Sequence, residues 1–261
     1  MKYWFFLILP FLLFEPIDAR SDTIILAADE WCPYNCKPNT TQEGYMIDIA
    51  RAVFEKAGHT LEYKTTSWAR AIADARAGKI TGIVGAIPEE VPDFIVPKES
   101  LGSSQNRFYA LSKTPWRYQN IASLSKVKLG IINGYGYHPD LLTYISANKS
   151  SPNIHVASGE HALEYNINMV LQNRLDALVE DQNVYDITAN KMGVINQLID
   201  AGALGAETPV YIAFSPASPH SQQYAELLSN GIIELRKSGE LLKILTKYNL
   251  KDWENKTSSN Q

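Results

Sequence analysis

The sequence contains little cysteine and little histidine. Cys32 and Cys36 are its only cysteines, and the nearest of the five histidines, His59, lies 23 positions beyond Cys36. A structural zinc site takes four ligands, so zinc is disfavoured at this pair. A thioredoxin-type motif has two residues between its cysteines, whereas three lie here. From the residues alone, a disulfide and a free reactive pair stay open, and a metal clip is the least favoured of the three alternatives. We expect no metal and no cofactor.

An excess of basic residues is also missing. The chain has 24 Lys and Arg against 28 Asp and Glu, which gives a net charge of −4. Without a basic patch, nucleic acid is not expected as a partner. No Ser-His-Asp or Cys-His arrangement is apparent either, and we therefore expect no enzyme.

Only one apolar run is long enough to suggest a membrane or an export signal. It spans 3–14, follows Lys2, and is too short to cross a bilayer as a stable helix. The residues up to Ala19 form a small-residue cleavage site. We therefore expect a cleaved signal peptide over 1–19 and export to the periplasm, with a retained anchor as the alternative. In an oxidising compartment two cysteines so close favour a disulfide, here between Cys32 and Cys36.

After the signal, strand and helix patterns alternate. Buried β-branched runs and helical spacings predict a first α/β unit, a proline-rich pause over 87–101, and a second unit. The predicted strands are 23–28, 60–65, 80–86, 107–113, 127–132, 153–157, 175–180 and 208–216. The predicted helices are 44–58, 67–78, 140–147 and 160–173, a helical stretch between 180 and 208, and further amphipathic helices interrupted by Gly239. Strands 107–113 and 208–216 either extend one large sheet or cross between two lobes.

A series of motifs in this order resembles a known family. They are "GYMIDIARAVFEKAG", "WARAIADARAGKITGIVGA", "RFYALSK", "KLGIINGYG", "NRLDALVED" and "PVYIAFSP". The series is similar to the family-3 extracellular solute-binding proteins, the periplasmic binding proteins of polar amino-acid ABC uptake systems. The resemblance implies an α/β, two-lobed Venus-flytrap (type II) fold with two crossing hinge strands. Its expected parts are the signal peptide 1–19, lobe 1 over 20–109 and 210–253, lobe 2 over 110–209, and a flexible tail over 254–261.

The family binds its ligands on loops at the carboxyl ends of strands, in the crevice between the lobes. Carried over by position, the expected ligand-binding residues are Asp29, Trp31, Tyr34, Tyr45, Trp68, Arg70, Gly85, Ala86, Asn133, Tyr135, Gly136, Tyr137 and Asp181. In the family the acid that matches Asp181 holds the ligand's amino group, and Glu180 is the substitute. As alternatives, the two tryptophans are core residues, Arg70 is a surface arginine and Asp181 is a helix cap.

One departure from the family pattern bears on the ligand. In the amino-acid binders a Thr-x-x-Arg-like segment follows the third strand, and its arginine pairs with the ligand's α-carboxylate. Here the segment from Ile87 to Val91 has no arginine. Either Arg70 or Arg107 replaces it from another wall, or the ligand has no α-carboxylate.

The resemblance implies a monomeric receptor that captures a small polar ligand, an amino acid or a related amine, and delivers it to an ABC permease. A sensor protein is an alternative partner. A dehydratase-like enzyme on the same fold is the rival from another class, because fold alone does not exclude chemistry.

Overall fold

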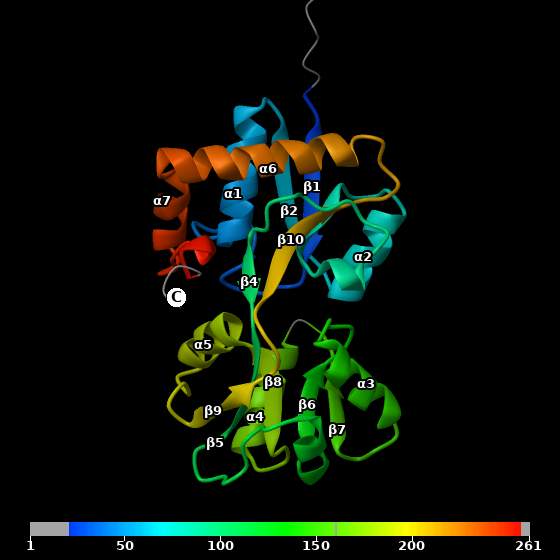
Figure 1. Ribbon diagram of the computed structural model, residues 1–261, viewed down its shortest axis with the longest axis vertical. Coiled ribbons are helices and arrows are strands. Elements are labelled where there is room, and N and C mark those ends of the chain that lie inside the picture. The colour runs from blue at the N-terminus through cyan, green and yellow to red at the C-terminus, as the bar shows by residue number, and fades with distance from the viewer. Residues whose placement is uncertain (1–20, 160, 257–261) are drawn as a thin grey trace, which may run out of the picture.

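The computed structural model describes residues 21–159 and 161–256. The expected signal peptide over 1–19 and most of the expected tail over 254–261 lie outside these residues. Within the described part, no helix is long and apolar enough to cross a membrane. The chain forms two α/β lobes, one above the other in Figure 1, each built around a five-stranded sheet.

The sheet of the first lobe has the strand order β2-β1-β3-β10-β4. β1 runs parallel to β2 and β3, whereas β10 is antiparallel to β3 and β4. The strands are β1 (Thr23–Ala28), β2 (Thr60–Thr65), β3 (Gly82–Ala86), β4 (Gly102–Ser104) and β10 (Thr208–Phe214). The helices are α1 (Tyr45–Lys56), α2 (Trp68–Arg76), α6 (Ser221–Ser238) and α7 (Glu240–Thr246), with 3-10 turns at Pro88–Glu90 and Trp253–Lys256.

The second lobe repeats this plan with the strand order β7-β6-β8-β5-β9. β6 runs parallel to β7 and β8, and β5 is antiparallel to β8 and β9. The strands are β5 (Asn106–Leu111), β6 (Leu129–Ile132), β7 (Ile154–Ala157), β8 (Ala177–Asp181) and β9 (Leu198–Ala203). The helices are α3 (Pro139–Ala147), α4 (Ala162–Leu171) and α5 (Gln182–Lys191), with a 3-10 helix at Ile121–Lys126.

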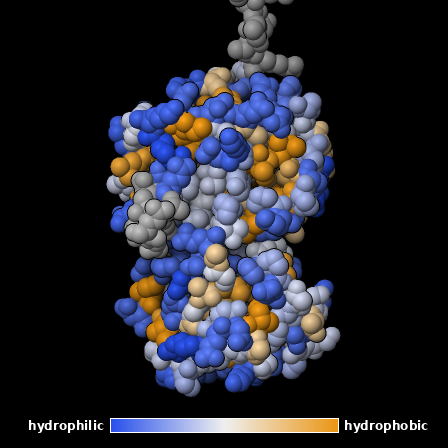
Figure 2. Space-filling model, viewed as in Figure 1, coloured by the Kyte–Doolittle hydropathy of each residue, from blue (hydrophilic) through white to orange (hydrophobic). Residues whose placement is uncertain are grey.

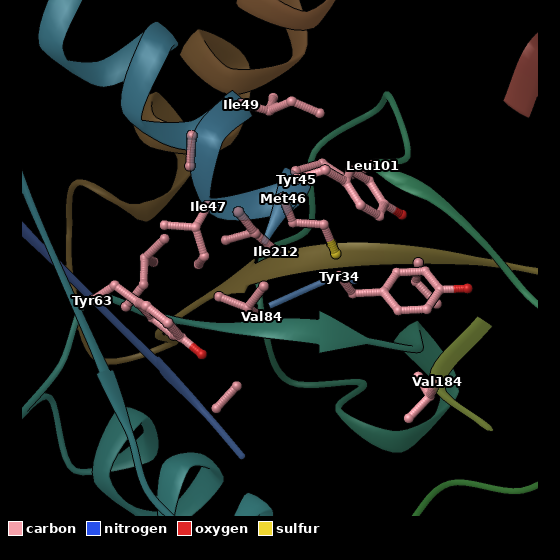
Figure 3. Close-up of a cluster of buried hydrophobic side chains, with 14 of the residues drawn as sticks. Tyr34, Tyr45, Met46, Ile47, Ile49, Tyr63, Val84, Leu101, Val184 and Ile212 are labelled. Atoms are coloured by element: carbon pink, nitrogen blue, oxygen red, sulfur yellow. The ribbon is translucent and has the colours of Figure 1, made fainter. Parts of the chain in front are cut away.

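Helices cover both faces of the first sheet because successive strand residues point to opposite sides. In β1, Ile24 and Leu26 belong to the cluster formed with α1, α6 and α7, whereas Ala27 belongs to the cluster formed with α2. Figure 1 shows α6 lying across the whole lobe. Figure 3 shows part of the larger cluster, with Met46 of α1 close to Ile212 of β10. The outer surface that faces the viewer in Figure 2 is mostly hydrophilic.

Two stretches carry the chain between the lobes. β4 and β5 are separated by Gln105 alone, and β9 and β10 are separated by residues 204–207. The predicted crossing strands are therefore present, and the chain forms two lobes and not one larger sheet. These crossings lie a few residues before the lobe boundaries expected at 109–110 and 209–210.

Most predicted elements are present, and the bounds of β1 and β2 are the predicted ones. The sequence does not predict β4 or β9, which are an edge strand of three residues and an edge strand interrupted by Gly202. α6 and α7 are separated at Gly239, as expected, because this glycine adopts a left-handed conformation at φ 78°.

Candidate functional site

The loop after β1 is closed by the predicted disulfide between Cys32 and Cys36. Its backbone also pairs with itself, because the N–H groups of Trp31 and Asn35 each donate to the other's carbonyl oxygen at 2.8 and 3.1 Å. The Asn35 side chain donates to the carbonyl oxygen of Asp29. Trp31 therefore stands on a loop that is held by covalent and hydrogen bonds.

The same loop supplies acceptors for the start of α1. The carbonyl oxygens of Pro33 and Tyr34 accept the N–H groups of Tyr45 and Met46, at 2.9 and 3.0 Å. A helix leaves its first N–H groups without partners inside the helix, and this loop satisfies two of them. The position of the loop is thus tied to that of the helix.

A narrow pocket lies between the lobes, at the ends of strands from both sheets. Its free volume is about 50 Å³, which leaves space for only a few water molecules. The first lobe lines it with Asp29, Trp31, Trp68, Val84, Gly85, Ile87, Glu90 and Ser104, and the second lobe with Asn106, Tyr135, Gly136 and Glu180.

Two hydrogen bonds join the lobes across this pocket. The Tyr135 hydroxyl of the second lobe donates to Asp29 Oδ2 of the first at 2.7 Å. Trp31 Nε1 of the first lobe donates to Glu180 Oε1 of the second at 3.3 Å. All four residues line the pocket, so two of the hydrogen bonds between the lobes are made by side chains of its wall.

Glu180 is the most deeply buried carboxyl group of the pocket, with 1% of its surface exposed. Its Oε1 accepts from the Asp181 N–H at 2.8 Å and from Trp31, whereas its Oε2 has no hydrogen-bond partner among the described residues. Burial, helped by the nearby carboxyl groups of Asp181 and Asp29 and opposed by the two hydrogen bonds, raises the pKa of Glu180 to about 8. These surroundings thus favour a protonated Glu180 at neutral pH.

The two other acids of the pocket are shifted in the same direction. Burial raises the pKa of Glu90 to about 7, opposed by a hydrogen bond with Trp68 and helped by the charges of Glu89 and Asp29. Burial also raises the pKa of Asp29, opposed by the hydrogen bond from Tyr135. No lysine, arginine or histidine is among the residues that line this pocket.

Aromatic side chains form the rest of the wall. The ring of Trp31 stacks on Tyr34, with the ring centroids 4.0 Å apart. A Cβ at Gly85, whose φ is 86°, would lie 3.2 Å from the Trp31 ring, so glycine allows this close approach. Trp68, the first residue of α2, is 7% exposed and lies on the same lobe.

Six of the residues predicted from the sequence line the pocket together: Asp29, Trp31, Trp68, Gly85, Tyr135 and Gly136. Tyr34, Tyr45 and Ala86 are buried behind it in the hydrophobic clusters and do not line it. Asn133 is exposed, and Tyr137 lines an adjoining pocket with its hydroxyl bound by the Ile132 N–H at 2.8 Å. That these residues bind a ligand stays a prediction.

Asp181 is buried and does not line the pocket. Its Oδ1 accepts the N–H groups of Asn183 and Val184 at the start of α5, at 2.9 and 3.1 Å. Its Oδ2 accepts from the hydroxyl of Ser104 at 2.8 Å and lies 3.1 Å from the hydroxyl of Tyr34. The helix-cap interpretation is correct for Asp181, and its neighbour Glu180 is the acid that lines the pocket.

The structure does not place an arginine in the pocket. Arg70 has 63% of its side chain exposed, and its Nε donates at 2.8 Å to Asp74, one turn later in α2. Arg107 donates at 2.7 Å to Asp200 and at 2.7 Å to Gln105. The expectation that Arg70 faces the cleft is therefore wrong, because Asp74 holds its guanidinium on the outer surface of the helix.

The sequence interpretation misses Val84, Ile87, Glu90, Ser104 and Asn106 of the pocket wall. For Glu90 a signal exists. Counted from Ile87, Glu90 is the fourth residue of the segment without arginine, which is where a Thr-x-x-Arg pattern places its cation. An acid thus stands where a base is expected. No comparable signal marks Ser104 or Asn106, which reach the pocket through the crossing of β4 into β5.

The described residues hold no group of three or more His, Cys, Asp or Glu side chains that could bind a metal ion. The pocket is thus a set of carboxyl groups and aromatic rings without the geometry of a metal centre.

Comparison with known proteins identifies the class. Residues 24–251 match the model of the bacterial extracellular solute-binding proteins, family 3, and the chain belongs to this family. None of the curated proteins matches it.

Solved structures with the same fold come from proteins of several kinds. A histidine kinase sensor domain with similarity to periplasmic binding proteins has a TM-score of 0.71 at 16% identity, covering 87% of this chain and 95% of its own. A structure from a study of glutathione import via GshT and the cystine ABC importer TcyBC of Streptococcus mutans has a TM-score of 0.71 at 16% identity, covering 90% and 99%. An ancestral amino acid-binding protein, described as a precursor of cyclohexadienyl dehydratase, has a TM-score of 0.64 at 20% identity, covering 87% and 95%. At these identities the likeness establishes the fold.

Proposed function

We propose that this chain is a periplasmic solute receptor that captures a small polar solute bearing an amine between its lobes and delivers it to an ABC permease. The observation that carries the proposal is the shared construction of the pocket. The hydrogen bonds Tyr135–Asp29 and Trp31–Glu180 join the lobes through side chains that line the pocket. A ligand that engages these side chains therefore biases the position of the lobes, which is how a hinge protein signals occupancy.

The roles of the side chains follow from their chemistry. Asp29 and Glu180 offer carboxyl oxygens to an amine, one from each lobe. Trp31 and Trp68 offer ring faces that suit the cation and its apolar neighbours. Because Gly85 and Gly136 have no side chains, the Trp31 ring and the Glu90 carboxyl group can pack against the backbone there as part of the pocket wall.

The partner that recognises the closed form is proposed to be an inner-membrane ABC permease, with the receptor acting as a monomer. The similarity to a structure from a study of an ABC importer supports this choice, and the similarity to a sensor domain supports a signalling partner as the alternative. Deleting the gene and measuring uptake of the identified solute separates them. Loss of uptake supports transport, whereas unchanged uptake with loss of a transcriptional response supports sensing.

An enzyme is the second candidate because of one observation. Glu180 is a buried carboxyl group whose pKa is raised to about 8, which is a property of general acids. The fold is shared with a precursor of a dehydratase. The two functions differ in what happens to the bound compound, which a receptor returns unchanged and an enzyme converts.

The experiment is a thermal unfolding screen against amines, amino acids, polyols and small carboxylates, followed by recovery of the bound compound and by solution scattering. We expect one solute to raise the unfolding temperature, to be recovered unchanged and to stabilise the compact form. Tyr135→Phe removes the bond to Asp29 and should weaken this compaction, whereas Tyr165→Phe on the exposed face of α4 should not. Conversion of the solute would contradict the receptor function.

A further inference from the structure

Glu180, which lines the pocket, carries an unsatisfied oxygen. The residue is 1% exposed, and its Oε2 is without a hydrogen-bond partner among the described residues while Oε1 has two donors. A buried polar atom without a partner costs free energy, and native proteins satisfy nearly all of them. The residue that carries this oxygen lines the pocket between the two lobes. Its missing partner is therefore best supplied by a bound molecule that donates hydrogen bonds.

The charged side chains that line the narrow pocket are all acidic, whereas His161 and Lys191 line a separate pocket on the other side of Glu180. The ionisable side chains of acid type that line the pocket are Asp29, Glu90 and Glu180, and no basic side chain lines it. Arg70 and Arg107, the two candidates to replace the missing arginine, are paired with Asp74 and Asp200. The pocket thus has three acceptor groups and nothing to balance a negative ligand.

We propose that the ligand of this pocket is a protonated amine that carries no carboxylate, with its cation held between Glu180, Asp29 and Glu90. This inference rests on the proposed receptor function and names the chemical class of its ligand. Each ammonium hydrogen can be donated to a carboxylate oxygen, and the Oε2 of Glu180 receives the partner it lacks.

A carboxylate on the same molecule would be repelled. Two like charges 4 Å apart interact by about 1 kcal/mol in water and by about 4 kcal/mol at the effective dielectric constant near a protein surface. In the amino-acid binders an arginine in the segment after the third strand pairs with the ligand's carboxylate and offsets this repulsion. Here Glu90 stands at the position of that arginine. An amino acid would therefore bind more weakly than the amine made by removing its carboxyl group.

The rings of the pocket suit the same ligand. Trp31, Trp68 and Tyr135 all line it, and a cation over a tryptophan or tyrosine face gains about 0.5 to 2 kcal/mol. The aromatic rings and the carboxyl groups of the wall thus both favour a positively charged ligand.

The ligand also has space beyond the narrow pocket. An adjoining pocket of about 270 Å³ shares Ile87, Glu90 and Gly136 with it and is bounded further out by Leu142 and Leu204. An amine in the narrow part can extend its hydrocarbon portion in this direction.

The test compares matched pairs of compounds that differ only in the carboxyl group: agmatine and arginine, cadaverine and lysine, histamine and histidine, tyramine and tyrosine. Binding is measured by calorimetry at pH 8 on the full mature chain. We expect at least one amine to bind 100-fold or more tightly than its amino acid. Glu180→Gln should weaken that amine at least 10-fold, and Glu90→Gln should weaken it as well. Glu62→Gln, an exposed change on β2, is the matched control and should leave the affinity unchanged.

Each other outcome overturns a distinct claim. An amino acid that binds as tightly as its amine, or a carboxylate or polyol that binds in place of any amine, contradicts the ligand class and leaves the receptor function standing. A protein that binds no compound of the whole panel contradicts the receptor function itself. If Glu180→Gln fails to fold, Glu90→Gln decides, because unchanged amine affinity in that folded variant removes the acidic wall from the site.

Discussion

At the residue scale, Trp31 links the cysteine loop to the pocket. Its indole N–H donates to Glu180 Oε1 at 3.3 Å, and its ring stacks on Tyr34. The disulfide Cys32–Cys36 encloses the residues that directly follow it. The first-lobe loop and the second-lobe acid are thus joined by one side chain.

Trp31→Phe keeps the ring and removes the hydrogen bond to Glu180. We expect the affinity for the amine to fall about 10-fold or more, since a hydrogen bond to a charged group contributes about 1.5 kcal/mol or more. Calorimetry measures it. Trp116→Phe is the matched control, because its indole N–H donates to Ser123 in the second lobe, away from the pocket. An equal loss in both variants would contradict a specific role for Trp31.

How far single residues could be predicted depends on what the pattern encodes. Trp31, Trp68 and Tyr135 are found because the family resemblance places its ligand site, by position, after the carboxyl ends of strands. Tyr45 is misplaced because its position at the start of α1 does not fix the direction of its side chain, which here is buried in the core. Glu90 is missed because the pattern drew attention to an absent arginine and not to the acid in its place.

At the element scale, Asp181 joins the start of α5 to the first lobe. It caps the N–H groups of Asn183 and Val184 and also accepts from Ser104 and from the N–H of Gln105 in the crossing strand. One carboxylate thus fixes a helix and the hinge region.

Asp181→Ala should lower the free energy of unfolding by about 3 kcal/mol, because it removes a helix cap and leaves buried donors without an acceptor. Asp140→Ala, in the first turn of α3, is the control and should change stability by less than about 0.5 kcal/mol because its side chain is exposed. Chemical denaturation measures both. Equal effects would indicate that Asp181 is an ordinary surface cap.

The elements themselves were largely predictable, because buried parallel strands have a strong apolar signal. β1 and β3 stand out for this reason, and the helices between them follow from their spacing. β4 and β9 could not be predicted, since a three-residue edge strand and an edge strand with Gly202 have neither the length nor the alternation of a strand pattern. The choice between one sheet and two lobes depends on how these edge strands pair with strands distant in the sequence, which the sequence pattern does not encode.

At the scale of the whole molecule, the buried carboxyl group of Glu180 makes the free energy of unfolding depend on pH. Glu180 faces Asp29, Glu30, Glu164 and Asp181, with His161 and Lys191 lining the pocket on its other side. The unfolded chain releases the Glu180 proton near 4.5, whereas the folded chain keeps it up to about 8. The stabilisation is therefore complete below pH 4.5 and is lost progressively as pH rises to about 8.

The ligand-free protein should thus become less stable between pH 5 and pH 8, and Glu180→Gln should be less affected by pH over that range. Thermal unfolding at a series of pH values measures both curves, with Glu62→Gln as the control. If the unfolding temperatures of the parent protein and of Glu180→Gln change with pH in parallel, Glu180 is already ionised in the ligand-free protein, which would contradict the raised pKa.

The central claim is that the pocket holds protons when empty and a cation when filled. Calorimetry of amine binding at pH 7, in two buffers of different ionisation enthalpy, counts the protons exchanged. With the pKa of Glu180 at about 8 and that of Glu90 at about 7, ionisation of both groups on binding predicts release of roughly 1.4 protons for each amine bound. Binding with no proton released, or with protons taken up, would contradict it.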